Sequence, residues 1–244
     1  MTEAAGEGDL GGSVAGNGIQ HQTVVFDSNV MFDPTRRYAL LSLVVAGAFM
    51  TRWSRALLDE WIHVIVREQR TTLERATYQR EKLLADFPEA LVSDIPAAVQ
   101  AMAAALVNDP GDAMIAACAL AVAPCTLLTF NGKDFKRTEL RAHGVHVRKP
   151  GPWLQERYAA LTDEEQHEWC AALDAHRDSL GGGAMTPEAY LDRLGTKERG
   201  LGAFVGAARA GVLALNRRDM PTTAQTTGAG PAPLTRDGGK HPLG

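Results

Sequence analysis

Four short apolar runs alternate with helical patterns up to about Arg148, and they constrain the fold more than any other feature of the chain. The runs lie at residues 23–26, 49–53, 126–130 and 144–147, and are dominated by β-branched, aromatic and other apolar residues. Predominantly apolar strands, without strict alternation, are typical of strands buried on both faces. The sequence therefore predicts an α/β fold in which helices flank a parallel sheet.

Past Pro150 the pattern is helical only. We expect a first domain at 22–152, followed by a small all-helical extension at 153–212. Segments 1–21 and 213–244 are rich in small residues and should be flexible tails, because they can bury too little apolar surface to order themselves. Apolar residues at helical spacing should form the core of the extension and its contact with the first domain: Trp153, Leu154, Tyr158, Trp169, Leu173, Tyr190, Leu194 and Phe204.

Composition excludes several classes of protein. The 244 residues carry a net charge of −4, from 25 basic and 29 acidic side chains, which excludes a polybasic protein. The longest apolar run, at 39–50, is shorter than the about 20 residues of a membrane span. Acidic residues occupy the N-terminal segment where a signal peptide would be basic, so we expect a cytoplasmic protein without membrane contact. Its cysteines, Cys118, Cys125 and Cys170, lack zinc-ligand spacing and should be buried thiols.

Polar and acidic residues lie where an α/β protein builds its sites. Asp27 directly follows the first strand, and Asn131 and Asp134 follow the third. Asp112 lies in the first turn of the preceding helix, and Glu60 lies at the edge of the apolar face of another helix. Sites in such sheets form at the carboxyl ends of strands, so these side chains are candidates for one site.

Each acid also has an ordinary structural explanation. Asp109 and Asp112 fit a helix start, and Asp27 fits a turn cap. Glu60 fits a surface acid paired with Arg55 or Arg67. A cluster of carboxylates is unfavourable without a cation between them, however, and oxygen ligands without Cys or His favour Mg²⁺ or Mn²⁺. Such ions commonly serve phosphoryl chemistry.

Four motifs together match those of a known family. They are V-V-F-D-S-N-V at 24–30, W-S-x-x-L-L-D-E-W at 53–61, D-P-x-D-x-x-I-A-A at 109–117 and L-T-F-N-x-K-D-F at 128–135. In this order they resemble the PIN domain, most closely the VapC-type ribonuclease toxins of bacterial toxin–antitoxin pairs. The segment after Pro152 is similar, more loosely, to the helical extension of one subgroup of these toxins.

The resemblance implies a PIN-like parallel sheet and metal-dependent cleavage of RNA with Mg²⁺ or Mn²⁺. It also implies an antitoxin protein as partner, and a homodimer is common among such toxins. Asp27, Glu60 and Asp112 fall on the metal-site acids of the family. Asn29 and Thr129 resemble the groups that orient those acids.

The fourth site position falls to Asn131 or Asp134. The family often has an acid where this chain has Asn131, and Asp134 in its Asp-Phe pair is also a family feature. Asn131 stands two residues past Thr129 and leaves the strand on the same face, so we expect Asn131 to face the pocket and Asp134 to matter less. A neutral amide adds no charge, so we expect one firmly held metal and a second only with substrate.

A local excess of basic residues follows the last motif and suits phosphate contacts, although an ordinary solvated surface is the alternative. Its members are Lys133, Lys136, Arg137, Arg141, Arg148 and Lys149, with Arg36 and Arg37 beside the first motif.

The leading hypothesis is a metal-dependent endoribonuclease that acts as the toxin of a toxin–antitoxin pair. One alternative is a PIN-type RNA-processing nuclease without a toxin role. Another is a non-catalytic PIN-like binding module, which the presence of Asp27, Glu60 and Asp112 disfavours. The chain has neither of the glycine-rich phosphate-binding motifs, so a nucleotide cofactor is not indicated.

Overall fold

The computed structural model describes residues 22–180, 184–196 and 200–218. The tail expected at 1–21 lies outside the described residues, as does 219–244. The elements of the first part are β1 (Thr23–Phe26), α1 (Ser28–Met31), α2 (Pro34–Val45), β2 (Met50–Ser54), α3 (Arg55–Arg67), α4 (Leu73–Asp86), η1 (Pro88–Ala90), β3 (Leu91–Val92), α5 (Ala97–Ala105), η2 (Pro110–Asp112), α6 (Ala113–Ala121), β4 (Cys125–Leu128), η3 (Gly132–Asp134), α7 (Arg137–Ala142) and β5 (Val145–Arg148). The extension contains α8 (Pro150–Ala159), α9 (Asp163–Ser179), α10 (Pro187–Leu194) and α11 (Gly202–Arg218).

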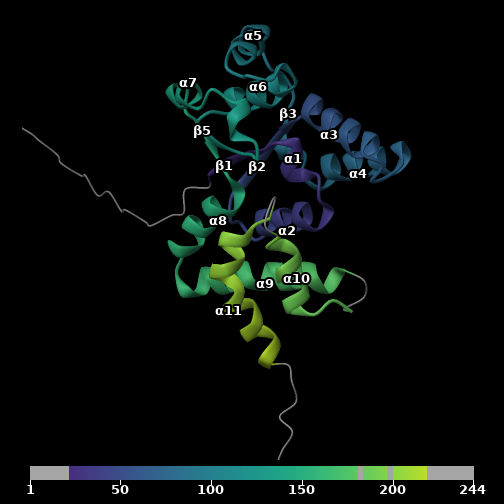
Figure 1. Ribbon diagram of the computed structural model, residues 1–244, viewed down its shortest axis with the longest axis vertical. Helices are drawn as coiled ribbons and strands as arrows, with labels where there is room; N and C mark the ends of the chain where they lie inside the picture. The colour runs from purple at the N-terminus through teal and green to yellow at the C-terminus, as the bar shows by residue number, and fades with distance from the viewer. Residues whose placement is uncertain (1–21, 181–183, 197–199, 219–244) are drawn as a thin grey trace, which may run out of the picture.

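Five parallel strands form one sheet in the order β3-β2-β1-β4-β5, which confirms the predicted α/β class (Figure 1). The chain passes from β1 to β2 on one side and later returns to β4 on the other, so the topological switch point lies between β1 and β4. Strand β3 was not expected, because two residues are too few to produce a recognisable pattern.

Capping residues explain where several helices begin and end. The Ser54 hydroxyl accepts a hydrogen bond from the Leu57 amide and starts α3 at the carboxyl end of β2. Thr162 and Glu165 form a reciprocal capping box that starts α9. Beyond the end of α2, Gly47 adopts a φ of +76°, which favours glycine and turns the chain towards β2.

The sheet is the centre of the hydrophobic core. Val24, Val25 and Phe26 of β1 are buried, and helix α6 packs across β1, β2 and β4. Helices α3 and α4 pack together as a pair at one edge of the fold (Figure 1). The three cysteines are buried free thiols, as expected.

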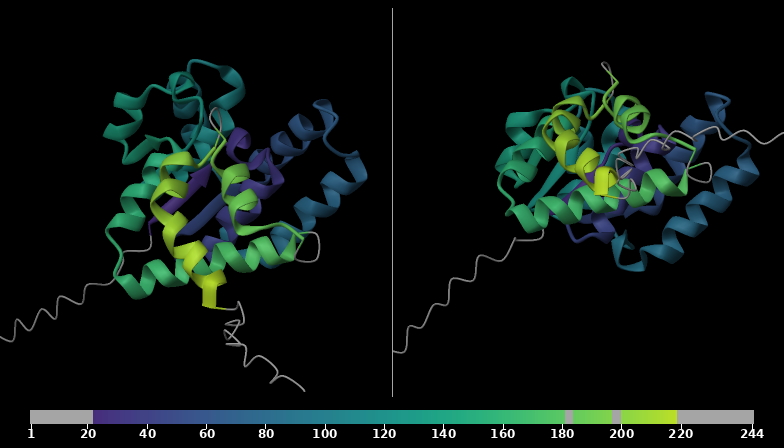
Figure 2. Two further views of the ribbon diagram at one scale, coloured as in Figure 1. Left: turned by 60° about the horizontal axis from the view of Figure 1, so that its bottom comes forward. Right: turned by 90° about the horizontal axis from the view of Figure 1, so that it is seen from below.

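The extension is a group of helices packed against α2. Helix α2 contacts α9 and α10, and Figures 1 and 2 show α10 and α11 crossing α9. The Trp153 ring meets Phe49 edge-on, with 5.4 Å between ring centroids. All the expected core residues of the extension are buried.

The ends of the extension differ from the expectation. Helix α8 begins at Pro150 instead of 153. Helix α11 continues to Arg218, past the boundary expected at 213, because Val212 is buried and the Asn216 side chain donates a hydrogen bond to Asp174 at 2.9 Å. No helix within the described ranges is both long and apolar enough to cross a membrane.

We predict that Trp153→Ala lowers the free energy of unfolding by about 3–5 kcal/mol, because it removes a large buried ring from the contact with Phe49. Denaturant unfolding measures the change. Trp153→Phe keeps an aromatic ring at the contact and should cost less than half as much. An alanine variant within about 1 kcal/mol of the wild type would contradict this account of the junction.

Candidate metal centre

Asp27 occupies the carboxyl end of the central strand. Its side chain is 2% exposed and accepts hydrogen bonds from the Thr129 hydroxyl and the Asn29 side-chain amide, both at 2.5 Å. The Ser28 hydroxyl and the Asn29 backbone amide donate to its other oxygen at 3.2 and 3.3 Å. Asp27 therefore caps the following turn, as one explanation predicted, but its carboxylate also stands at the switch point of the sheet.

Asn29 and Thr129 orient this carboxylate, in agreement with the role that the resemblance implied for them. Asn29 also donates to the Thr129 hydroxyl at 3.2 Å and accepts a hydrogen bond from the Phe130 amide at 3.1 Å. These contacts tie the loop after β1 to the loop after β4. The geometry of Asp27 therefore depends on both loops.

Arg36 and Arg37 do not form the phosphate-binding surface that the sequence suggested. Arg36 is buried, donates to the backbone oxygens of Val30 and Asn29 at 2.8 and 2.9 Å, and lies over the Phe130 ring. Arg37 is also buried and donates to the Met31 oxygen at 2.7 Å. Both guanidinium groups instead hold the segment after β1 in place.

Asp109, Asp112 and Asp134 form an acidic trio. One carboxylate oxygen from each lies within 4.8 Å of the other two, and such a group could hold a metal ion. Asp109 is the N-cap of the short turn η2 and Asp112 is its last residue, while Asp134 ends η3 after β4. Asp112 is at the N-cap position of α6, yet its side chain makes no capping hydrogen bond, so its carboxylate is available as a ligand.

Asn131 and Asp134 have different roles in the loop after β4. The Asn131 side-chain amide donates a hydrogen bond to the Asp134 carboxylate, and its backbone amide donates to the Thr129 hydroxyl at 2.9 Å. The carboxylate that joins the trio is thus that of Asp134. The positional argument missed this because the turn η3 brings Asp134 back towards α6.

Glu60 lies half-buried on α3. Its Oε2 atom is buried and accepts no hydrogen bond, which leaves an unpartnered acceptor. The neighbouring Asp59 instead pairs with Arg80 at the surface, as expected from its position on the helix. Glu60 forms no direct ion pair with Arg55 or Arg67, although the charge of Arg67 acts to lower its pKa against the larger effect of burial.

We call Asp27, Glu60 and the trio the acidic cluster. Burial and the charges of Asp27 and Asp109 raise the pKa of Glu60 to about 7. Burial and then the charge of Asp27, followed by the other three carboxylates, raise the pKa of Asp112 to about 7. Burial also raises the pKa of Asp27, against the opposing effect of its hydrogen bonds.

The cluster fits a hard divalent cation. All its charged groups are carboxylates, and none of them forms an ion pair with a basic side chain in the described part of the chain. A cation would offset their repulsion and could partner Glu60 Oε2. Sequence reasoning missed Asp109 as a site residue because its side chain does cap η2, accepting a hydrogen bond from the Gly111 amide at 2.9 Å. The sequence signal that could have identified Asp109 was the pair of acids in Asp-Pro-x-Asp at 109–112.

The basic residues after the last motif divide into two groups. Arg137, Arg141, His146 and Arg148 line a hollow of about 520 Å³ between α7 and β5, which we call the basic hollow. Lys136 instead donates to the Ala105 backbone oxygen at 2.8 Å, and Lys133 and Lys149 are exposed outside this lining.

Comparison with known proteins adds no assignment. No family model matches the chain, and neither a curated protein nor a solved structure matches it. Function therefore has to be argued from the site itself.

We predict that the metal-free protein becomes less stable as pH rises from about 4.5 to about 7. Glu60 and Asp112 bind protons more tightly in the folded than in the unfolded state, so deprotonation across this window favours unfolding. Melting temperatures in EDTA across the pH range measure the effect. Asp112→Asn should raise the melting temperature at the upper end and flatten the profile.

Asp94→Asn, at an exposed carboxylate outside the cluster, is the matched control and should leave the profile unchanged. A profile for Asp112→Asn that parallels the wild type would show that repulsion within the cluster does not limit stability.

Proposed function

We propose that the chain is a metal-dependent ribonuclease with a PIN-like fold that hydrolyses RNA phosphodiester bonds. The observation that carries the proposal is the acidic cluster. Carboxylates from the end of β1, from α3, and from η2 with its N-cap and η3 gather at the carboxyl edge of a parallel sheet, and none of them forms an ion pair among the described residues. The resemblance of four motifs to PIN domains supports the same activity.

The acidic trio would hold Mg²⁺ or Mn²⁺, with Asp27 and Glu60 beside it. When bound, such an ion supplies an activated water and offsets charge on the phosphate. Donors from two loops fix the orientation of the Asp27 carboxylate. Glu60 lies beside the trio with an unpartnered Oε2, so its carboxylate could contact the ion or accept a hydrogen bond from a water held by the ion.

The basic hollow supports a polyanionic substrate. Strand β5 is the neighbour of β4, and the Thr129 amide donates to the Arg148 backbone oxygen at 3.0 Å. Thr129 also donates a hydrogen bond to the Asp27 carboxylate, so it connects Asp27 with Arg148. The basic hollow therefore lies at the same edge of the sheet as Asp27. Arg148 pairs with an exposed Glu156, and such surface pairs are weak enough for a phosphate to compete.

The VapC-type resemblance further supports a role as the toxin of a toxin–antitoxin pair, with an antitoxin protein as partner. Expression without a partner should then inhibit growth of the host, and an Asp112→Asn variant should not. An active nuclease that leaves growth unchanged would favour the RNA-processing alternative.

The nuclease proposal is tested by cleavage of single-stranded RNA in Mg²⁺ or Mn²⁺. We predict that Asp112→Asn reduces the rate by at least about 100-fold, because it removes one charged ligand from the trio, while the melting temperature is retained or raised. Asp94→Asn is the control and should cleave as the wild type does. Undiminished cleavage in excess EDTA would contradict the metal mechanism.

We predict that Arg137→Ala combined with Arg141→Ala raises KM for RNA with little change in kcat, because the hollow contacts phosphates away from the reacting bond. Salt titration of RNA binding should give a slope reduced by about one for each phosphate that the variant no longer neutralises. Arg75→Ala combined with Arg193→Ala, at exposed arginines on α4 and α10, removes the same charge and is the matched control. Equal effects of the two sets of changes would assign the weaker binding to net charge alone.

A further inference from the structure

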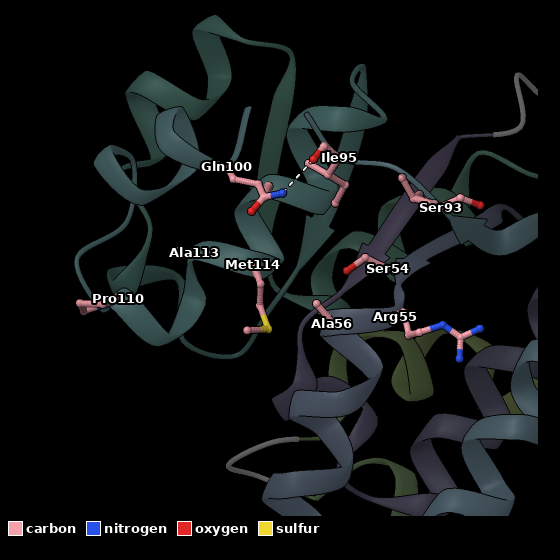
Figure 3. A pocket seen from close by; sticks show the side chains of 11 residues that line it. Ser54, Arg55, Ala56, Ser93, Ile95, Gln100, Pro110, Ala113 and Met114 are labelled. Atoms are coloured by element: carbon pink, nitrogen blue, oxygen red, sulfur yellow. Dashed lines mark hydrogen bonds between the residues drawn. The ribbon is translucent and has the colours of Figure 1, made fainter. Parts of the chain in front are cut away.

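A neutral pocket adjoins the acidic cluster. It has a volume of about 410 Å³, within the range of small-molecule sites, and it lies between the start of α3, the segment after β3, and helices α5 and α6 (Figure 3). None of the five cluster acids lines it. Arg55 lies at its border, and Figure 3 shows the guanidinium pointing away from the other lining side chains.

The pocket and the cluster share two elements of the fold. Pro110 and Ala113 line the pocket, and they directly follow Asp109 and Asp112 in the chain. On α3, Ala56 lines the pocket one turn before Glu60, so the two residues share a face of that helix. A ligand whose charged part meets the cluster would therefore bring an adjoining group to the pocket.

The walls of the pocket suit a flat apolar group. Ala56, Ala113 and Ala117 contribute methyl groups, and the side chain of Met114, which is 37% exposed, extends along one side (Figure 3). A thioether is polarizable and packs favourably on aromatic rings. Small side chains opposite it leave room for a ring.

One polar atom in the pocket has a fixed orientation. The Gln100 side chain donates from Nε2 to the Ile95 backbone oxygen at 2.8 Å. Because a backbone carbonyl can only accept a hydrogen bond, the amide atom that faces Ile95 must be Nε2. The other amide atom, Oε1, then points towards the side of Met114 (Figure 3). The pocket thus presents a hydrogen-bond acceptor beside apolar walls.

We propose that this pocket binds one nucleobase of the RNA substrate and prefers a base that carries an amino group. The inference rests on the proposed ribonuclease function, which places a phosphate of the same strand at the neighbouring cluster. An unstacked base in single-stranded RNA offers a flat face to the alanines and Met114, and its edge to Gln100. Adenine and cytosine present an amino donor to Oε1, whereas uracil places carbonyl oxygens on both sides of its single N–H.

The test measures binding of labelled short oligo(A), oligo(C) and oligo(U) to the full chain in EDTA, by fluorescence anisotropy. The wild type should bind oligo(A) or oligo(C) about five- to tenfold more tightly than oligo(U), as expected for one hydrogen bond gained against one acceptor clash. Gln100→Leu should remove this preference. Gln155→Leu, at an exposed glutamine on α8, is the matched control and should retain it.

Gln100→Leu also removes the hydrogen bond to Ile95 and could loosen that loop. A second variant, Ala56→Leu, avoids this effect because it fills the pocket and leaves the bond between Gln100 and Ile95 intact. It should weaken binding of oligo(A) and oligo(C) towards the value for oligo(U). A preference that survives both changes would overturn the proposal and leave the pocket to another ligand, such as a protein segment.

Cleavage assays in Mg²⁺ separate this inference from the function on which it rests. Base preference in binding without any cleavage would contradict the nuclease but support the pocket. Cleavage by a wild type that binds the three oligonucleotides equally would overturn the pocket alone.

Discussion

The site is organised by the burial of the Asp27 carboxylate. A buried carboxylate needs donors or a cation, and here the donors are hydroxyl and amide groups from the loops after β1 and β4. These bonds orient Asp27 but carry no full positive charge. Burial raises the pKa values of Glu60 and Asp112, and the charge of Asp27 raises them further. A cation at the cluster would relieve this repulsion, and its binding would then also stabilise the fold.

Two buried arginines show how the scaffold supports this arrangement. Arg36 and Arg37 donate to backbone oxygens after β1, and Arg36 also lies over Phe130 after β4. The loops at the switch point are thereby joined through hydrogen bonds and a cation–π contact. The helical extension packs on α2 and on Phe49, and none of its residues belongs to the acidic cluster. The extension therefore contributes to the packing of the fold, whereas the candidate metal site lies at the edge of the sheet.

The division between an acidic cluster and a neutral pocket has a consequence for recognition. Carboxylates that gather around a cation attract phosphate through that cation, without reading sequence. The neighbouring pocket is lined by no carboxylate and has one oriented acceptor, which is why we propose that it distinguishes one base edge from another. The acidic cluster and the pocket are adjacent because two segments contribute to both. Glu60 and Ala56 lie one turn apart on α3, and Asp112 directly precedes Ala113 at the start of α6.

Local patterns in the chain were sufficient to predict the parallel sheet, four of its five strands, and the core of the extension, because burial on both faces and helical periodicity are visible in short segments. Asp27, Glu60 and Asp112 were proposed as site residues from the four motifs and from the place of Asp27 after a strand, and in the folded chain their charges lie close enough to act on one another. Three features emerged from the folded structure alone: Asp109 joins Asp112 and Asp134, Arg36 and Arg37 are buried braces, and Arg137, Arg141 and Arg148 share a hollow. Those outcomes depend on the path of short turns and on contacts between segments far apart in the chain, which composition and periodicity do not encode.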